Sequence, residues 1–272
     1  MNYRHAFHAG NFADCMKHVL LVWLLRALAR KPAGFMVLDT HAGIGSYDLA
    51  AGPAARTGEW QAGIARLLDA TQPALADYLG LVRDLGLYPG SPALMRAVLR
   101  PQDRLVCCEL HPEDHAILRR RHARDPQVAV HLRDGWGAVS AFLPPAERRG
   151  LVLIDPPYEA PGEFGRVVRT LAAAQARFRG GVFAAWYPIK HRAPVREFHT
   201  AIRESNLRNV VAAELWLREP LDPTRLNGCG LVVVNPPFGF TEAAPDMLAA
   251  LLDRLGDGEP GAGTVVETLA GE

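Results

Sequence analysis

Apolar positions recur along the chain with two spacings, and their alternation predicts a mixed α/β protein. Short apolar runs that end in a polar or turn-forming residue predict strands at residues 35–39, 104–109, 128–132, 151–154, 181–187, 210–217 and 230–235. Stretches with apolar side chains at helical spacing lie at residues 13–30, 56–100, 111–124, 164–179 and 194–206. This alternation favours a mostly parallel sheet with helices on both faces. The segment from Gly256 is Gly-rich and acidic, and its sequence indicates little about its structure.

The long segment between the first two predicted strands indicates an insertion. Residues 51–100 contain several helical stretches and their own turn signals, including Tyr-Pro-Gly-Ser-Pro at residues 88–92. A chain of 272 residues is long for one minimal domain and short for two full ones. We therefore predict a main domain formed by residues 1–50 and 101–272, with residues 51–100 as an inserted helical subdomain.

The composition is that of a globular protein, with 49% hydrophobic and 22% charged residues. The net charge is +1, so nucleic-acid binding would need a local basic face. Only Lys17, Lys31 and Lys190 are lysines, so 27 of the 30 basic residues are arginines. The four cysteines form no Cys-x-x-Cys pair, which indicates neither a disulfide framework nor a zinc site. The apolar run at residues 19–25 is too short to span a bilayer, and we expect a cytoplasmic protein without membrane partners.

Polar residues follow the predicted strands where a nucleotide cofactor would bind. Nucleotides bind a doubly wound sheet at the carboxyl ends of its strands. These ends carry Asp39 with residues 41–45, Glu109, Asp134 with Gly135, and Asp155. The order suits S-adenosylmethionine: a small-residue loop admits the cofactor, Glu109 can accept both ribose hydroxyls, and Asp134 can bind the adenine amine. The dinucleotide pattern is absent, because residue 48 is Asp and Glu109 lies 64 residues after Gly45.

The segment Asp155-Pro156-Pro157-Tyr158 has the chemistry needed for amine methylation. It resembles the signature of methyltransferases that modify a planar exocyclic amine such as adenine N6. The lone pair of that amine is delocalised into the ring, so the amine is a poor nucleophile. The Asp155 carboxylate and the Pro156 carbonyl can each accept a hydrogen bond from the amine, which favours a pyramidal nitrogen. The prolines provide no competing N–H, and Tyr158 offers a flat face for an extruded base.

A second Pro-Pro segment, Asn235-Pro236-Pro237-Phe238, is a variant of the same signature. Asp155 follows the fourth strand, directly downstream of the acids that suit the cofactor. Asn235 follows the seventh strand, which in this architecture is inserted antiparallel. We therefore assign catalysis to Asp155 and interpret residues 235–238 as a turn that ends a strand.

Residues 3–18 are rich in basic and histidine side chains and have no core pattern before residue 13. A metal site formed by His5, His8 and His18 would lack a thiolate or acid at suitable spacing, so we predict no bound metal. The remaining alternatives are a solvated arm and a lid over cofactor and target base. We predict a lid motif at residues 1–18, with Tyr3 and Arg4 near the substrate.

Nine motifs, in order along nearly the whole chain, resemble the RlmJ family of bacterial methyltransferases for adenine N6 in large-subunit ribosomal RNA. They lie at residues 3–11, 17–18, 38–43, 56–59, 88–91, 109–112, 153–158, 186–188 and 235–237. The resemblance implies a Rossmann-like class I fold that uses S-adenosylmethionine, with a helical insertion after the first strand. It implies catalysis by Asp155, contact of Tyr3 with 23S ribosomal RNA, and a cofactor site made by His18, His41, Ser91, Glu109, Asp134, Gly135 and Asp155.

We therefore predict single-step methyl transfer to N6 of one adenine in 23S ribosomal RNA, protein-free or in an early assembly form, by a monomer. Lys17 either steers a substrate phosphate, orients the lid, or is a surface lysine at a helix start. A DNA adenine or cytosine-N4 methyltransferase is an alternative, disfavoured because no sizeable target-recognition domain is present. Protein glutamine methylation is a further alternative, but methyltransferases with that activity usually have Asn in place of Asp155. A non-catalytic RNA-binding factor would have lost cofactor residues, and none is lost.

Overall fold

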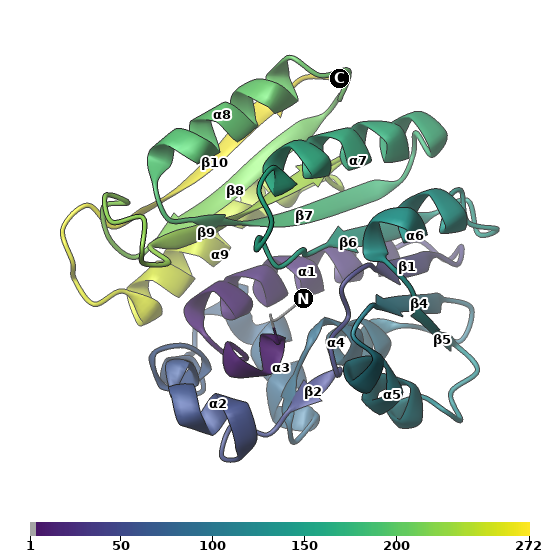
Figure 1. The fold of residues 1–272 in the computed structure, drawn as a ribbon, viewed down its shortest axis with the longest axis horizontal. Coiled ribbons are helices and arrows are strands. Elements are labelled where there is room, and N and C mark those ends of the chain that lie inside the picture. The colour runs from purple at the N-terminus through teal and green to yellow at the C-terminus, as the bar shows by residue number, and fades with distance from the viewer. Residues whose placement is uncertain (1–3) are drawn as a thin grey trace.

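A computed structural model describes residues 4–272, which form an eight-stranded sheet covered by helices on both faces (Figure 1). The strand order is β10-β8-β9-β7-β6-β1-β4-β5. The strands are β1 Met36–Asp39, β4 Arg104–Glu109, β5 Val128–Leu132, β6 Gly150–Ile154, β7 Val182–Ile189, β8 Val210–Trp216, β9 Gly228–Val234 and β10 Gly263–Ala270. The central strands β1 and β6 are apolar, apart from Asp39 at the end of β1, because both of their faces are buried.

The sheet is parallel from β5 to β7 and becomes antiparallel at β9. β9 lies between β7 and β8 and runs antiparallel to both. β10 adds an antiparallel edge strand beside β8. The parallel strands therefore present their carboxyl ends at one edge of the sheet, while β9 ends at the opposite edge.

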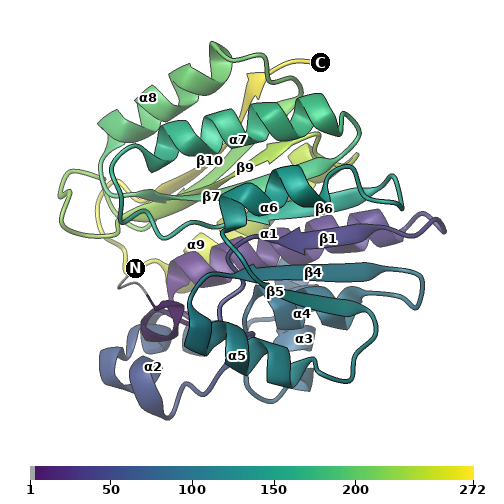
Figure 2. The same ribbon diagram turned by 45° about the vertical axis from the view of Figure 1, so that its right-hand side comes forward.

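Two layers of helices enclose the sheet, as Figure 2 shows from a second direction. One face packs against α6 Gly135–Phe142, α7 Glu163–Arg177 and α8 Arg192–Arg203. The other packs against α1 Phe12–Ala29, α4 Ser91–Val98, α5 Pro112–Arg121 and α9 Phe240–Leu255. α1 is almost entirely buried, which explains why its apolar positions run around most of the helix.

The segment between β1 and β4 is mostly helical and packs into the same core as α1. It contains α2 Gly52–Thr57, α3 Ala76–Asp84, α4 and the short antiparallel pair of β2 Ser46–Tyr47 with β3 Tyr88–Pro89. Buried Leu75 and Tyr78 belong to one apolar cluster with Leu20 and Leu24 of α1. The helical insertion after the first strand is therefore continuous with the core of the sheet.

The insertion also holds the N-terminal segment in place. Glu59 accepts a hydrogen bond from Nδ2 of Asn11 and lies 3.0 Å from Nδ1 of His8. The hydroxyl of Thr57 donates to the carbonyl of Phe7 over 2.6 Å. Two motifs that are about fifty residues apart in sequence thus contact each other in the fold.

The predicted α/β architecture is confirmed, and the predicted bounds of β4 and β5 match the structure. α6, α9 and β10 were not predicted, and neither were the two-residue strands β2 and β3. α6 is short and contains Gly137, and the pattern of α9 is interrupted by Pro245. The segment beyond Gly256, whose sequence indicated little, contains β10, which forms there through pairing with β8. Within residues 4–272, no helix is long and apolar enough to cross a membrane.

Candidate active site

A cavity at the carboxyl ends of the parallel strands gathers most of the residues predicted to bind the cofactor. It encloses about 1020 Å³ of empty space, its open mouth included. This size is ordinary for a ligand site. The predicted residues that line it are His41, Ser91, Glu109, Asp134, Gly135 and Asp155.

The carboxylate of Glu109, at the end of β4, is held by backbone donors. The N–H of Gly43 donates to Oε2 over 2.8 Å, and the N–H of His111 donates to Oε1 over 2.7 Å. A carboxylate has about four lone-pair sites, so each oxygen can accept one further hydrogen bond. The position suits acceptance from a pair of vicinal hydroxyls.

Asp39 ends β1 behind the cavity wall and ties two lining segments together. The hydroxyl of Ser91 donates to its Oδ2 over 2.6 Å, and the N–H of His41 donates to Oδ1 over 3.3 Å. Burial raises the pKa of Asp39 to about 6, although the hydrogen bond from Ser91 opposes the shift. Burial also lowers the pKa of His41 to about 4, so its imidazole is neutral near pH 7.

The start of α6 forms the far wall of the cavity. Asp134 caps the helix, and its side chain accepts the N–H of Gly137. Gly135 lies so close to the β1 loop that an added Cβ would be 2.2 Å from the carbonyl oxygen of Thr40. Only glycine therefore allows this approach. The guanidinium of Arg166 stacks 4.6 Å from the ring centroid of Trp136 and lies 3.7 Å from Asp134.

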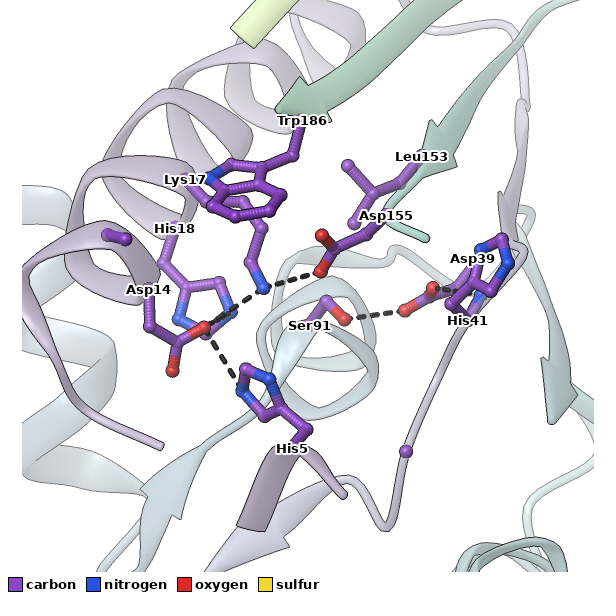
Figure 3. A network of polar contacts seen from close by, with 12 residues as sticks. His5, Asp14, Lys17, His18, Asp39, His41, Ser91, Leu153, Asp155 and Trp186 are labelled. Atoms are coloured by element: carbon purple, nitrogen blue, oxygen red, sulfur yellow. Dashed lines mark hydrogen bonds and ion pairs between the residues drawn. The ribbon is translucent and has the colours of Figure 1, made fainter. Parts of the chain in front are cut away.

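Lys17 of α1 places its ammonium between two carboxylates, as Figure 3 shows. Its Nζ donates to Oδ2 of Asp155 over 2.7 Å and lies 2.9 Å from Oδ1 of Asp14. Burial by itself lowers the pKa of Lys17, but Asp14 and Asp155 raise it well above its usual value. The alternative of a surface lysine is wrong, since the residue is only 4% exposed.

A second, larger groove adjoins the cavity on the other side of Asp155. It encloses about 1910 Å³, open solvent included, and shares four lining residues with the cavity: His5, Lys17, Asp155 and Pro157. The groove, but not the cavity, is also lined by Pro156, Tyr158 and Trp186. The hydroxyl of Tyr158 donates to the carbonyl of Trp186 over 2.8 Å, which fixes the ring beside the Trp186 indole. Asp155 thus stands where the two spaces meet.

Two of the predicted residues lie outside both spaces, and one falls outside the described chain. His18 does not line the cavity: it is fully buried, with Nδ1 3.1 Å from the Tyr88 hydroxyl. Arg4 pairs with Glu113 over 2.5 Å and contacts His111 at the start of α5. Arg4 therefore lies beside the cofactor cavity, which His111 lines, and not in the groove. Tyr3 is outside the described residues.

Asn235 is distant from Asp155, at the opposite edge of the sheet. Val234 pairs with Phe183 at the start of β7, whereas Ile154 pairs with Ala185 farther along that strand. The Nδ2 group of Asn235 donates to the carbonyl of Gly181 over 2.7 Å and to that of Arg179 over 2.8 Å. The segment that begins at Asn235 is therefore a turn that ends β9, in agreement with the interpretation from strand order.

Three residues of the site were not identified from the sequence: Asp14, Trp136 and Arg166. Trp136 directly follows Asp134 and Gly135, and its position next to two predicted cofactor-binding residues could have identified it. Asp14 and Lys17 lie three residues apart in a mostly apolar helix, a spacing typical of an intrahelical ion pair. No local pattern indicated Arg166, because α7 reaches the cavity only through packing. Among residues 4–272, no group of three or more His, Cys, Asp or Glu could hold a metal ion.

The strand order, the inserted antiparallel β9 and the strand-end cavity together define a class I S-adenosylmethionine-dependent methyltransferase. A family model described as ribosomal RNA large subunit methyltransferase D, RlmJ, matches residues 32–267. The chain belongs to this family, as its motifs indicated.

Individual relatives match over almost their whole length. A Haemophilus influenzae protein named ribosomal RNA large subunit methyltransferase J is 38% identical, with 94% of each chain covered. A protein of the same name from Escherichia coli K12 is 37% identical, covering 97% of this chain and 98% of the relative. A crystal structure from Legionella pneumophila superposes with a TM-score of 0.88 at 33% identity, covering 96% and 98% of the two chains.

Proposed function

We propose that this protein transfers a methyl group from S-adenosylmethionine to N6 of one adenine in 23S ribosomal RNA. The observation that carries the proposal is the position of Asp155 between the cofactor cavity and the larger groove. A carboxylate there faces both a bound cofactor and a base that enters from the other side. The names of the relatives, which act on large-subunit ribosomal RNA, support the choice of substrate.

The cofactor cavity has the donor and acceptor groups that S-adenosylmethionine needs. When bound, the cofactor supplies an electrophilic methyl group. Each oxygen of Glu109 can accept a ribose hydroxyl while keeping its backbone donor. Asp134 can accept from the adenine amine, and Gly135 lines the cavity beside it.

Lys17 and Asp155 act together on the target amine. Lys17 holds Oδ2 of Asp155, and no hydrogen bond reaches Oδ1 from residues 4–272. Oδ1 can therefore accept one N6 hydrogen, and the Pro156 carbonyl, which lines the groove, can accept the other. Two fixed acceptors draw the nitrogen toward a pyramidal geometry without strong base catalysis. The ring of Tyr158 provides a surface on which the extruded base stacks. The proton is released to solvent after transfer.

Replacement of Asp155 tests the proposal. Asp155→Ala removes one of the two preorganised acceptors, so we expect kcat to fall by roughly 10²–10³. The affinity for S-adenosylmethionine should change only modestly. Exposed Asp246 on α9 offers a matched control, and Asp246→Ala should retain full activity. The measurement is incorporation of labelled methyl groups into protein-free 23S ribosomal RNA, followed by identification of the methylated nucleoside by mass spectrometry.

The same assay distinguishes the alternatives. Duplex DNA and a protein substrate are incubated in parallel with the ribosomal RNA. Methylation of DNA or protein in preference to RNA, or a product other than N6-methyladenosine, would contradict the proposed substrate. Full activity of the Asp155→Ala variant would contradict the proposed role of that carboxylate.

A further inference from the structure

The groove beside Asp155 holds a cation that no acid of the described residues, 4–272, neutralises. Lysines and arginines that line this groove are Lys17, Lys190, Arg218 and Arg225. Lys17 lies between Asp14 and Asp155, while Arg218 and Arg225 lie 2.7 Å and 3.6 Å from Glu259. Lys190 is exposed, and no carboxylate of residues 4–272 comes within 4.0 Å of its ammonium. An unpaired ammonium at the wall of a substrate groove is suited to an anionic group of the substrate.

Lys190 is held at a defined place relative to Asp155. The register pairs Ile154 with Ala185, so Asp155 lies beside Trp186 on the neighbouring strand. Lys190 is four residues farther along the chain, which corresponds to about 13 Å in an extended strand. The Nδ2 group of buried Asn227 donates to the carbonyl of Lys190 over 2.7 Å and so fixes its backbone.

We propose that Lys190 binds a backbone phosphate of the substrate RNA, on the target nucleotide or its neighbour. This rests on the proposed function. A base whose amine contacts Asp155 does not itself extend as far as Lys190, so the group that arrives there is the sugar–phosphate backbone. Between the two positions the groove is lined by Trp186, Pro188 and partly buried Leu226. This apolar wall suits the face of a sugar or of an adjacent unstacked base.

The inserted segment offers fewer free cations to RNA than its arginines suggest. Arg66 pairs with Asp257 over 2.5 Å, and Arg96 pairs with Asp125. Arg56 stacks on the ring of Phe7, at 5.2 Å from its centroid. Arg56 and Arg83 have no carboxylate partner among residues 4–272, but no arginine of residues 51–100 lines the groove. The geometry therefore favours the end of β7 over the insertion as the first phosphate contact next to the target base.

Two variants of Lys190 and one control test this contact. The experiment measures filter binding of 23S ribosomal RNA in the presence of S-adenosylhomocysteine, over a range of salt concentrations. Lys190→Ala should weaken binding by roughly three- to tenfold and reduce the slope of log K against log salt by about 1. Lys190→Arg should retain both. Lys31, the other exposed lysine, lies at the end of α1 away from the groove, so Lys31→Ala should match the wild type.

Kinetics separates a binding contact from a structural defect. Lys190→Ala should raise KM for RNA while kcat at saturating RNA stays within about twofold of the wild type. If Lys190→Ala binds RNA with wild-type affinity and salt slope while the wild type methylates RNA, the phosphate contact is refuted and the proposed function stands. If the wild type neither binds nor methylates ribosomal RNA, both proposals are refuted.

Discussion

Lys17 and His18 are neighbours in α1 and are both buried, yet Lys17 is charged near pH 7 and His18 is neutral. Lys17 stays protonated because Asp14 and Asp155 compensate for the loss of water around its ammonium. His18 has no such pair of carboxylates, and burial lowers its pKa to about 3. Its Nε2 lies 3.4 Å from the Asp14 oxygen that Lys17 also contacts, and its Nδ1 contacts the Tyr88 hydroxyl. The two residues show that burial alone does not decide the charge of a side chain.

The neutral His18 makes the stability of the protein depend on pH. In the unfolded chain this histidine has a pKa of about 6.5, so between pH 6.5 and about 3 the unfolded state binds more protons than the folded state. Stability should therefore fall on acidification, by up to about 1.4 kcal/mol per pH unit from this group. Urea unfolding of wild type and His18→Gln at pH 7, 5 and 4 checks this.

The variant removes the titrating imidazole, so its stability should fall less steeply with acid. Asp39, whose pKa is set by other neighbours, titrates in both proteins and cancels in the comparison. Parallel curves of stability against pH for the two proteins would contradict the assignment of a buried neutral His18.

Among the elements, the start of α6 depends on two glycines that lie in different surroundings. Gly135 packs against the loop after β1, where a Cβ would be 2.2 Å from the Thr40 carbonyl oxygen. Gly137 lies two residues later, and a Cβ there would approach only Oδ2 of Asp134, at 3.9 Å. The same substitution therefore has different consequences at the two positions.

We expect Gly135→Ala to push α6 away from the β1 loop and to lower the affinity for S-adenosylmethionine at least tenfold. Gly137→Ala should leave the affinity near wild type and add roughly 0.5–1 kcal/mol of stability, because alanine favours a helix over glycine. Isothermal titration calorimetry measures the first effect, and urea unfolding measures the second. Equal cofactor affinity in the two variants would show that the close contact at Thr40 does not shape the cavity.

For the molecule as a whole, the inserted segment and the sheet share one apolar cluster. Residues of α3 and of the turn before it pack with α1, α9 and the central strands. The division into a main domain of residues 1–50 and 101–272 and an inserted subdomain of residues 51–100 remains a prediction from the sequence. The shared core leads us to expect that both parts unfold together.

Tryptophans report on each part separately: Trp60 lies in the insertion and Trp216 on β8. In single-tryptophan variants that keep one or the other, the urea midpoint by fluorescence should equal the same variant's midpoint by far-UV circular dichroism. An earlier fluorescence transition for Trp60 alone would show that the insertion unfolds independently.

The pattern of side chains predicted the elements whose stability comes from complete burial. β4 and β6 are continuous apolar runs because both of their faces are covered, so their bounds were visible in the sequence. β10 has a single buried residue, Leu269, and exists because it pairs with β8, so its own side chains gave little signal. α9 continues past Pro245 because Phe240, Leu248 and Leu251 are held in the core.

The sequence by itself determined which candidate site residues follow which strands. It thereby also determined that Glu109, Asp134 and Asp155 lie close together. Carboxyl ends of parallel strands meet at one edge, so order along the chain becomes position in space. Only the tertiary structure decided that Lys17 pairs with Asp155, 138 residues away, and that His18 is enclosed behind the cavity. It also decided that, among the lysines and arginines of residues 4–272 that line the groove, Lys190 has no acid partner. Such contacts depend on how helices and loops pack against the sheet, and local sequence patterns do not encode that packing.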